Sequence, residues 1–266
     1  MAGDHWALAD AAATSAGVEL EPLESLEDAD HIAEVMVATW GNHQELPREL
    51  IRALQGSGNV PWGALHNGRL VGYVLGWLGR DADGLHVHSH MLAVLGEWRA
   101  RGVGYALKLA QRAVALDAGV HVVRWTFDPA NAANAYFNLA KLGADADAFH
   151  RSYYGRMDDA LNRGERSDRL VARWDLARVA PGPAPDRGAV VVDRSGPDDA
   201  CEPTRVQPPE AGPALVRIPP AYRDLRASSP ELAERWREAI ASGLEACLGA
   251  GLRATGFTST AAYVFT

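Results

Sequence analysis

Two glycines, Gly102 and Gly104, stand at the start of a long apolar helix expected at Val103–Asp117, directly behind a predicted strand. The first turn of a helix has backbone N–H groups without intrahelical acceptors and the positive end of the helix dipole. Glycine has no side chain to keep an anion away from those amides. Arg99 and Arg101 add positive charge in the same turn. The segment therefore predicts an anion site for a nucleotide-like cofactor.

Two common phosphate-binding signatures do not fit this segment. A dinucleotide-binding GxGxxG motif needs a third glycine, which is absent here at that spacing, and no acidic strand end is evident roughly 20 residues further on. A P-loop needs Gly-Lys-Ser/Thr, which the chain does not contain. The alternative that both glycines only serve strand-to-helix packing stays open from the residues alone.

Hydrophobic periodicity predicts the order β-α-α-β-β-β-α-β-α-β for the larger part of the chain. The strands are expected at 18–22, 60–66, 70–79, 85–95, 121–127 and 170–176, and the helices between 25 and 41 and at 47–54, 103–117 and 130–142. Asn67-Gly68 predicts a hairpin between the second and third strands, because both turn positions need positive φ. Helices alternate with strands late but not early, so we expect an α/β fold with a mixed central sheet flanked by helices.

Composition divides the chain into four segments. Residues 1–17 are Ala-rich and predict a helix or tail, and residues 18–177 hold the order of elements given above. Residues 178–213, rich in Pro, Gly, Asp and Arg, predict a linker or long surface loop, with only Ala189–Val192 as a candidate strand. Residues 214–266 predict a small C-terminal β-α-β unit. Because roughly fifty residues with one apolar stripe seldom fold alone, we expect this unit to pack on the first domain.

Charge and hydropathy exclude several partners. A formal charge of −8, with no run of basic residues, argues against nucleic acids and anionic membranes. No window approaches 18 uninterrupted apolar residues, and the N-terminus has no basic region followed by an apolar core, so neither a membrane span nor a signal peptide is expected. Cys201 and Cys247 cannot build a disulfide framework, which favours a cytoplasmic location.

Three segments resemble the motifs of one known family. Arg99-Ala100-Arg101-Gly102-Val103-Gly104 matches the Arg/Gln-x-x-Gly-x-Gly/Ala signature of the GNAT superfamily of acyl-CoA-dependent N-acyltransferases. Asp128-Pro129-Ala130-Asn131 and Lys141-Leu142-Gly143 resemble its second motif. The resemblance covers about residues 18–177 and extends to a bacterial group of predicted acetyltransferases. It implies a GNAT fold, acetyl-CoA or another acyl-CoA as co-substrate, and a small primary amine or amino acid as acceptor.

The resemblance also implies which residues contact the cofactor. The backbone amides from Arg101 to Tyr105 should hold the pyrophosphate. The strand edge near Leu92 and Val94 should bond the pantetheine amides, and an amide there could hold the thioester oxygen as it becomes an oxyanion. Asn138 could contact cofactor or substrate, its alternative being a solvated helix position. The candidate cofactor-binding residues are Leu92, Val94, Arg99, Arg101, Gly102, Val103, Gly104, Tyr105 and Asn138.

His86, His88 and His90 alternate along one predicted strand and therefore project from one face. An amine acceptor is largely protonated at neutral pH, with a pKa near ~10, and histidine titrates nearest to neutrality. His88-Ser89-His90-Met91-Leu92-Ala93-Val94 resembles the His-x-His-x-Leu-Ala-Val segment of arylalkylamine N-acetyltransferases, which implies that His88 and His90 are catalytic general bases acting through water. Two alternatives stay open: hydrogen-bonded structural histidines, and a zinc-binding pair that lacks an identified third ligand.

The chain departs from the family at one position. Many GNAT proteins carry a tyrosine four residues before the equivalent of Gly143, and this tyrosine acts as a general acid toward the departing thiolate. This chain has Leu139 at that position. Chemistry does not demand the tyrosine, because a CoA thiol with a pKa near ~8.5 can leave as thiolate. A non-catalytic acyl-CoA-binding module with a regulatory or interaction role is the second function that stays open. The C-terminal unit could extend the sheet within the chain or across a homodimer.

Overall fold

The computed structural model describes residues 5–41, 46–155, 157, 164–178, 181–205, 209 and 212–266. Within these ranges the chain forms two compact units, and each is described by itself. Unit 1 comprises residues 1–125 and 157–165, and unit 2 comprises residues 126–156 and 166–266.

Unit 1 contains a mixed sheet and four helices. Its elements are α1 (Ala7–Ala16), β1 (Glu19–Pro22), α2 (Leu26–Trp40), α3 (Arg48–Gly56), β2 (Trp62–His66), β3 (Arg69–Asp81), β4 (Gly84–Val94), the short 3-10 helix η2 (Gly96–Trp98), α4 (Val103–Asp117) and most of β5 (Val122–Phe127). The strands follow the order β1-β2-β3-β4-β5. Neighbours from β1 to β4 are antiparallel, whereas β4 and β5 are parallel. The predicted α/β class and mixed sheet are thus confirmed.

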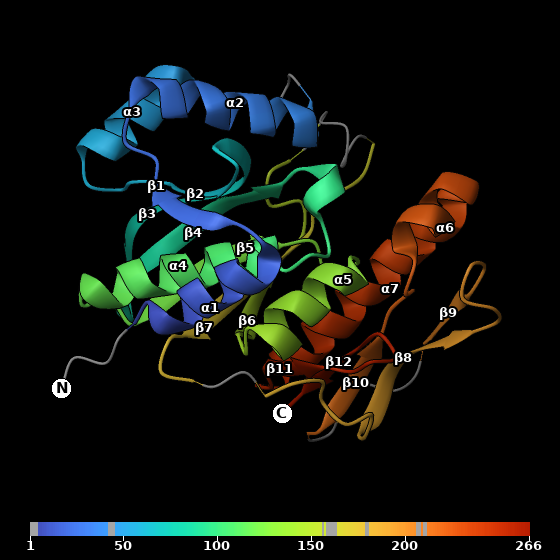
Figure 1. The fold of residues 1–266 in the computed structure, drawn as a ribbon. Helices are drawn as coiled ribbons and strands as arrows, with labels where there is room; N and C mark the ends of the chain where they lie inside the picture. Colours follow the sequence, from blue (N-terminus) through green and yellow to red (C-terminus); the bar gives the residue numbers. More distant parts are fainter. Residues whose placement is uncertain are drawn as a thin grey trace. The chain divides into compact units, whose positions relative to one another are not determined.

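Helices cover both faces of the sheet in unit 1 (Figure 1). Ile32 and Met36 of α2 pack with Tyr73 of β3 in the core on one face. Leu107 of α4 packs with Val74, the residue that follows Tyr73 in β3, in the core on the other face. Because successive side chains of a strand point to opposite faces, β3 and β4 contribute to both cores.

Local sequence signals account for several element boundaries. Ser25 begins α2 with a capping box: its Oγ accepts from the backbone N of Asp28 at 3.0 Å, and its own N donates to Asp28 Oδ2 at 2.7 Å. Asn67 and Gly68 form the two-residue turn between β2 and β3 with φ values of 50° and 75°. Helix α4 spans the residues that its apolar pattern predicts.

Unit 2 contains a second set of strands and the longest helix. Its elements are the end of β5, α5 (Ala132–Ala135), the π-helical segment η3 (Tyr136–Lys141), β6 (Asp145–His150), β7 (Arg169–Asp175), β8 (Ala189–Ser195), β9 (Glu202–Arg205), β10 (Ala214–Arg217), α6 (Tyr222–Ser228), α7 (Pro230–Gly249), β11 (Ala254–Phe257) and β12 (Ala262–Phe265). Its strands follow the order β7-β6-β11-β12-β10-β8-β9. Trp236, Ile240 and Leu244 of α7 are buried, as their spacing predicts. Among the described residues, no helix combines the length and apolar character that crossing a bilayer requires.

Several elements of unit 2 differ from the prediction. Residues 178–213, expected as a linker with one candidate strand at Ala189–Val192, contain β8, which includes that run, and also β9. Strand β8 pairs with both β9 and β10. The helix expected at 130–142 is the short α5 followed by the π-helical η3. The β-α-β unit expected at 214–266 has one strand more than predicted, because the antiparallel pair β11 and β12 follows its long helix. Strand β6 is not among the predicted elements, because its Asp and Ala residues have low strand propensity.

Candidate functional site

The N-terminus of α4 is not capped by a side chain. Gly102 occupies the N-cap position, and its carbonyl accepts from the backbone N of Tyr105 and of Ala106, both at 3.0 Å. Gly102 is exposed, and Gly104 is partly exposed. The amides of the first turn therefore keep hydrogen-bonding capacity that the helix itself does not use.

The turn before α4 bends through two left-handed residues. Ala100 has φ 61° and Gly102 has φ 93°. Left-handed residues in a turn can bring successive backbone N–H groups together into a concavity that suits an anion. The two arginines of the turn have different surroundings. Arg99 Nε donates to the Val94 carbonyl at 3.2 Å, whereas the guanidinium of Arg101 lies 5.1 Å from the ring centroid of Trp98.

Gly104 has no packing reason to be glycine in the described structure. A Cβ there would lie 3.7 Å from Leu92 Cδ2 and 3.9 Å from Val94 Cγ2, which is ordinary van der Waals contact, and its φ is not left-handed. Glycine inside a helix costs roughly 1 kcal/mol relative to alanine. A phosphate group bound against the backbone amide of residue 104 would leave no room for a side chain and would require glycine here. The turn therefore fits a diphosphate. At Gly102, by contrast, the positive φ explains the glycine by itself.

Strand β4 presents an edge beyond its pairing with β5. The two strands pair at Val87–Val123 and His88–Arg124, whereas the pairing of β4 with β3 continues as far as Val94. Leu92 and Val94 are partly exposed and lie in the stretch that pairs with β3 alone. This edge of β4 can offer its backbone groups to the amides of an extended ligand.

His90 is the extra residue of a β-bulge in β4, because Leu75 pairs with Met91 and the next residue of β3, Gly76, pairs with Ser89. His88 and His90 both lie against Trp77, with ring centroids 5.0 and 4.9 Å from it, and their own ring centroids are 5.9 Å apart. The two imidazoles therefore share one face of the sheet. His90 is exposed, and His88 is partly buried.

Burial lowers the pKa of His88 to about 4, and the positive charges of His90, His86 and Lys108 act in the same direction. Although His90 is exposed as a residue, partial desolvation of its ring also lowers the pKa of His90. In the described part of the chain, neither imidazole has a hydrogen-bond partner, which argues against the alternative of hydrogen-bonded structural histidines. Both rings are neutral at neutral pH and can accept a proton, although the low pKa of His88 makes it a weak base.

His86 belongs to a separate cluster near the β3–β4 turn. Its ring lies over Gly79, where a Cβ would be 2.7 Å from His86 Nε2. Its Nδ1 is 3.5 Å from Asp81 Oδ2, and Asp81 also pairs with Arg124. No three His, Cys, Asp or Glu side chains within the described ranges are arranged to hold a metal ion, so the zinc alternative gains no third ligand there.

Lys108 is a polar residue of the site region that motif reasoning missed. It lies on α4 with a relative exposure of 2%. Its Nζ donates to Ser89 Oγ at 2.9 Å and to Gln111 Oε1 at 2.8 Å, and it lies 4.0 Å from the ring centroid of Trp125. Burial lowers the pKa of Lys108 to about 7. The sequence signal was a lysine within the apolar pattern of the predicted helix.

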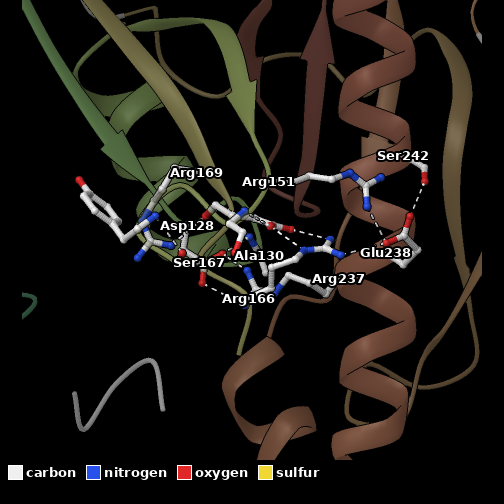
Figure 2. A network of polar contacts seen from close by, with 12 residues as sticks. Asp128, Ala130, Arg151, Arg166, Ser167, Arg169, Arg237, Glu238 and Ser242 are labelled. Atoms are coloured by element: carbon white, nitrogen blue, oxygen red, sulfur yellow. Dashed lines mark hydrogen bonds and ion pairs between the residues drawn. The ribbon is translucent and has the colours of Figure 1, made fainter. Parts of the chain in front are cut away.

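In unit 2, the residues after β5 are held by the C-terminal segment (Figure 2). Asp128 Oδ1 accepts from the backbone N of Ala130 at 2.9 Å and from Arg237 Nη1 at 2.6 Å, and Asp128 Oδ2 accepts from Arg237 Nη2 at 3.2 Å. The hydroxyl of Tyr263 donates to the Pro129 carbonyl at 2.8 Å. Side chains from α7 and β12 thus fix the start of the segment that resembles the second family motif.

Asn138 lies in the π-helical segment η3 of unit 2 and is 3% exposed. The alternative of a solvated helix position is therefore wrong. π-Helical turns occur frequently at functional sites, but a contact between Asn138 and the cofactor remains a prediction. Leu139 is fully buried, so the position at which the family resemblance led us to look for a general-acid tyrosine is part of the core here.

Residues 23–143 match the family model described as the acetyltransferase (GNAT) family. The matched segment contains β4, which carries the three histidines and is called the histidine strand below, and the turn with Gly102 and Gly104, called the glycine turn. It also contains the residues that follow β5. The match to this family identifies the segment as an acetyltransferase, an enzyme whose acetyl donor is acetyl-CoA. Residues 23–143 therefore form a GNAT-family acetyltransferase domain.

Three solved structures are similar to the chain. The ribosomal-protein-S18-alanine N-acetyltransferase of Escherichia coli has 17% identity and a TM-score of 0.49, covering 61% of this chain and 96% of that chain. The yncA protein of Salmonella typhimurium, solved with acetyl-CoA, has 20% identity and a TM-score of 0.49, covering 64% and 98%. An aminoglycoside acetyltransferase from an uncultured soil metagenomic sample, in complex with sisomicin, has 19% identity and a TM-score of 0.39, covering 42% and 78%. No curated protein matches the sequence.

Proposed function

We propose that the chain transfers the acetyl group of acetyl-CoA to a small primary amine or amino acid, by direct attack of the amine while both substrates are bound. The observation that carries this proposal is the N-terminus of α4, where no side chain caps the helix and Gly104 has no packing partner that requires glycine. A diphosphate bound at these amides would account for both features.

The proposed cofactor site extends from the helix turn to the strand edge. Backbone amides from Arg101 to Gly104, including that of Val103, would hold the pyrophosphate, with the charges of Arg99 and Arg101 nearby. The expected contribution of the Tyr105 amide is not kept, because this N–H already donates to the Gly102 carbonyl at 3.0 Å. The edge of β4 near Leu92 and Val94 would bond the pantetheine amides.

Bound acetyl-CoA supplies a thioester whose acyl carbon forms the new C–N bond while the C–S bond breaks and CoA leaves as thiolate. The attacking ammonium must first lose a proton, and His88 and His90 would accept it, through water. Because His90 is exposed and the pKa of His88 is low, a proton taken up there passes readily to solvent. No thiolate nucleophile takes part, since burial raises the pKa of Cys247 to about 12 and also raises that of Cys201.

The test measures release of free CoA thiol from acetyl-CoA in the presence of a panel of amines, amino acids and aminoglycosides. We expect turnover with at least one acceptor, and a loss of about 100-fold in kcat in the double variant His88→Ala/His90→Ala, because a positioned base contributes about that factor or more. The dissociation constant for acetyl-CoA should stay within about twofold of the wild-type value, since neither imidazole lies in the glycine turn. His121→Ala, which removes an exposed histidine before β5, is the matched control. Tight acetyl-CoA binding without thiol release for any acceptor would identify a binding module instead.

A further inference from the structure

Three elements of unit 1 meet beneath the bulge of β4. Ser89, which lies between His88 and His90, is 6% exposed and points to the opposite face, where its Oγ accepts from Lys108 of α4. Gln111, one turn further along α4, accepts from the same ammonium. The helix that begins at the glycine turn is thus hydrogen-bonded to the strand that carries both histidines.

Gly76 of β3 makes this contact possible. A Cβ at Gly76 would lie 2.5 Å from the carbonyl oxygen of His88 and 3.1 Å from Gln111 Nε2. The bulge begins at the same position, because Gly76 pairs with Ser89 whereas Leu75 pairs with Met91. A side chain at this position would therefore separate α4 from the bulged strand.

The cluster suits an ammonium better than a guanidinium. The Lys108 ammonium has three donors in a compact tetrahedral arrangement, and a hydroxyl, an amide oxygen and the face of Trp125 surround it. The planar fork of arginine matches paired oxygens instead. The chain contains 24 arginines and only two lysines, so a lysine at this buried position is an exception to its usual choice of cation.

Other charged groups lie around the histidine strand. On β4, His86 is 3.5 Å from Asp81 of β3, and Asp81 also pairs with Arg124 of β5. The core between this face of the sheet and α2 and α3 is formed by apolar side chains such as Ile32, Met36 and Ile51. Lys108 is one of the positive charges that act on His88, together with His86 and His90.

We propose that Lys108, Ser89 and Gln111 form a positioning cluster that holds the β4 bulge in the shape in which His88 and His90 share one face, and that the charge of Lys108 acts on His88 from the opposite face of the sheet. This inference rests on the proposed role of the two histidines as proton acceptors. Lys108 does not lie on the histidine face, so it acts on the reaction only through the strand and through its charge.

The test uses Ser89→Ala, which removes one hydroxyl, and Lys108→Met, which removes the cation at similar length. We expect each to lower kcat about 5- to 20-fold, because the loss of a buried hydrogen bond allows the bulge to shift. The dissociation constant for acetyl-CoA should change less than about twofold, and Ser89→Thr, which keeps the hydroxyl, should recover most of the activity. In Lys108→Met the acid limb of the kcat/KM profile should move to higher pH, because loss of a nearby positive charge raises the pKa of an imidazole. A purely structural role would not move that limb.

Arg48→Met, which removes an exposed cation of unit 1, is the control and should leave kcat and the pH profile unchanged. If Lys108→Met fails to fold, Ser89→Ala and Ser89→Thr carry the test. In the His88→Ala/His90→Ala background, Lys108→Met should cause no further loss. Retained activity in His88→Ala/His90→Ala would overturn both the proposed base and this inference. Lost activity in His88→Ala/His90→Ala, combined with a wild-type kcat and pH profile in the single variants Ser89→Ala and Lys108→Met, would overturn the positioning cluster alone.

Discussion

At Gly104 the preference of the helix and the needs of the proposed diphosphate point in opposite directions. Alanine would suit the first turn of α4, since its Cβ would meet no protein atom closer than 3.7 Å. We expect Gly104→Ala to keep the free energy of unfolding or to raise it by up to about 1 kcal/mol. The same methyl group would crowd the amides of the turn, so acetyl-CoA should bind about tenfold more weakly or worse. Chemical denaturation and isothermal titration calorimetry measure the two effects.

Gly119, just beyond the other end of α4, is the matched control. Its φ is 72° and a Cβ added there would meet nothing within 4 Å, so only backbone strain opposes alanine at this position. Gly119→Ala should lower stability by about 1 kcal/mol and leave acetyl-CoA binding unchanged. Wild-type affinity in Gly104→Ala would mean that the diphosphate does not bind at this turn.

The buried amine of Lys108 can be titrated directly, because the chain has only one other lysine, Lys141. Carbon-13 NMR of a lysine-labelled sample should give two side-chain signals, and the one missing from Lys108→Met belongs to Lys108. We expect that signal to titrate with a pKa of about 7, since burial disfavours the ammonium. A midpoint near the ordinary value of 10.5 would show that the amine is solvated.

The same shift predicts how stability depends on pH. The folded chain binds fewer protons than the unfolded chain between about pH 7 and the ordinary pKa of 10.5, so the stability contributed at Lys108 rises with pH across that window. The stability difference between wild type and Lys108→Met, measured by urea denaturation, should therefore move in favour of wild type between pH 7 and pH 10, on the order of 1 kcal/mol or more.

At the scale of single residues, the sequence singles out candidates whose chemistry is local. The paired glycines and the alternating histidines carry their meaning in neighbouring positions, so both could be singled out without a structure. Lys108 and Ser89 are 19 positions apart and meet only because α4 packs on β4. The sequence offered no rule that would pair them.

Between β3 and β4, the neighbouring backbone leaves no room for a side chain at Gly76. A Cβ there would lie 2.5 Å from the backbone oxygen of His88, and a backbone atom cannot move aside as a flexible side chain can. We expect Gly76→Ala to destabilise unit 1 by about 1–3 kcal/mol, the usual cost of overpacking. Thermal unfolding followed by circular dichroism measures the change. Gly56→Ala, with nothing within 4 Å and no left-handed φ, should be neutral or stabilising. Equal effects of the two substitutions would contradict the close approach.

Elements with a strong period or a defined end could be predicted, whereas short elements among Pro and Gly could not. The apolar pattern indicated the observed bounds of α4, and Asn67-Gly68 indicated the hairpin turn. Strand β8 contains the candidate run Ala189–Val192, whereas β9 is stabilised by pairing with β8 rather than by a pattern of its own. The π-helical η3 has the composition of an ordinary helix, so its different hydrogen bonding is not visible in the sequence.

At the scale of the chain, the C-terminal segment completes a unit that begins inside the family match. Unit 2 starts at residue 126, and the family match ends at residue 143. Within unit 2, β11 pairs with β6 at Ala254–Ala146, so strands from both sides of residues 178–213 belong to one sheet. The sequence predicted that residues 214–266 would pack on preceding structure but did not identify the partner residues, because Asp128 and Arg237 are far apart in the chain.

Arg237 tests whether the C-terminal helix stabilises the segment after β5. Its guanidinium is 5% exposed and bonds both carboxylate oxygens of Asp128, which is 22% exposed. Arg237→Met would leave a largely buried carboxylate without its cation, so the free energy of unfolding should fall by about 2–4 kcal/mol. Arg235→Met on the same helix removes a cation paired with Glu202 at the surface and should change stability by less than about 0.5 kcal/mol. Guanidinium denaturation of the two variants gives the comparison.

Asp128→Asn combined with Arg237→Met should recover part of the loss, because it removes the uncompensated charge. Similar stabilities for Arg237→Met and Arg235→Met would mean that the C-terminal segment does not hold the residues after β5 through this ion pair.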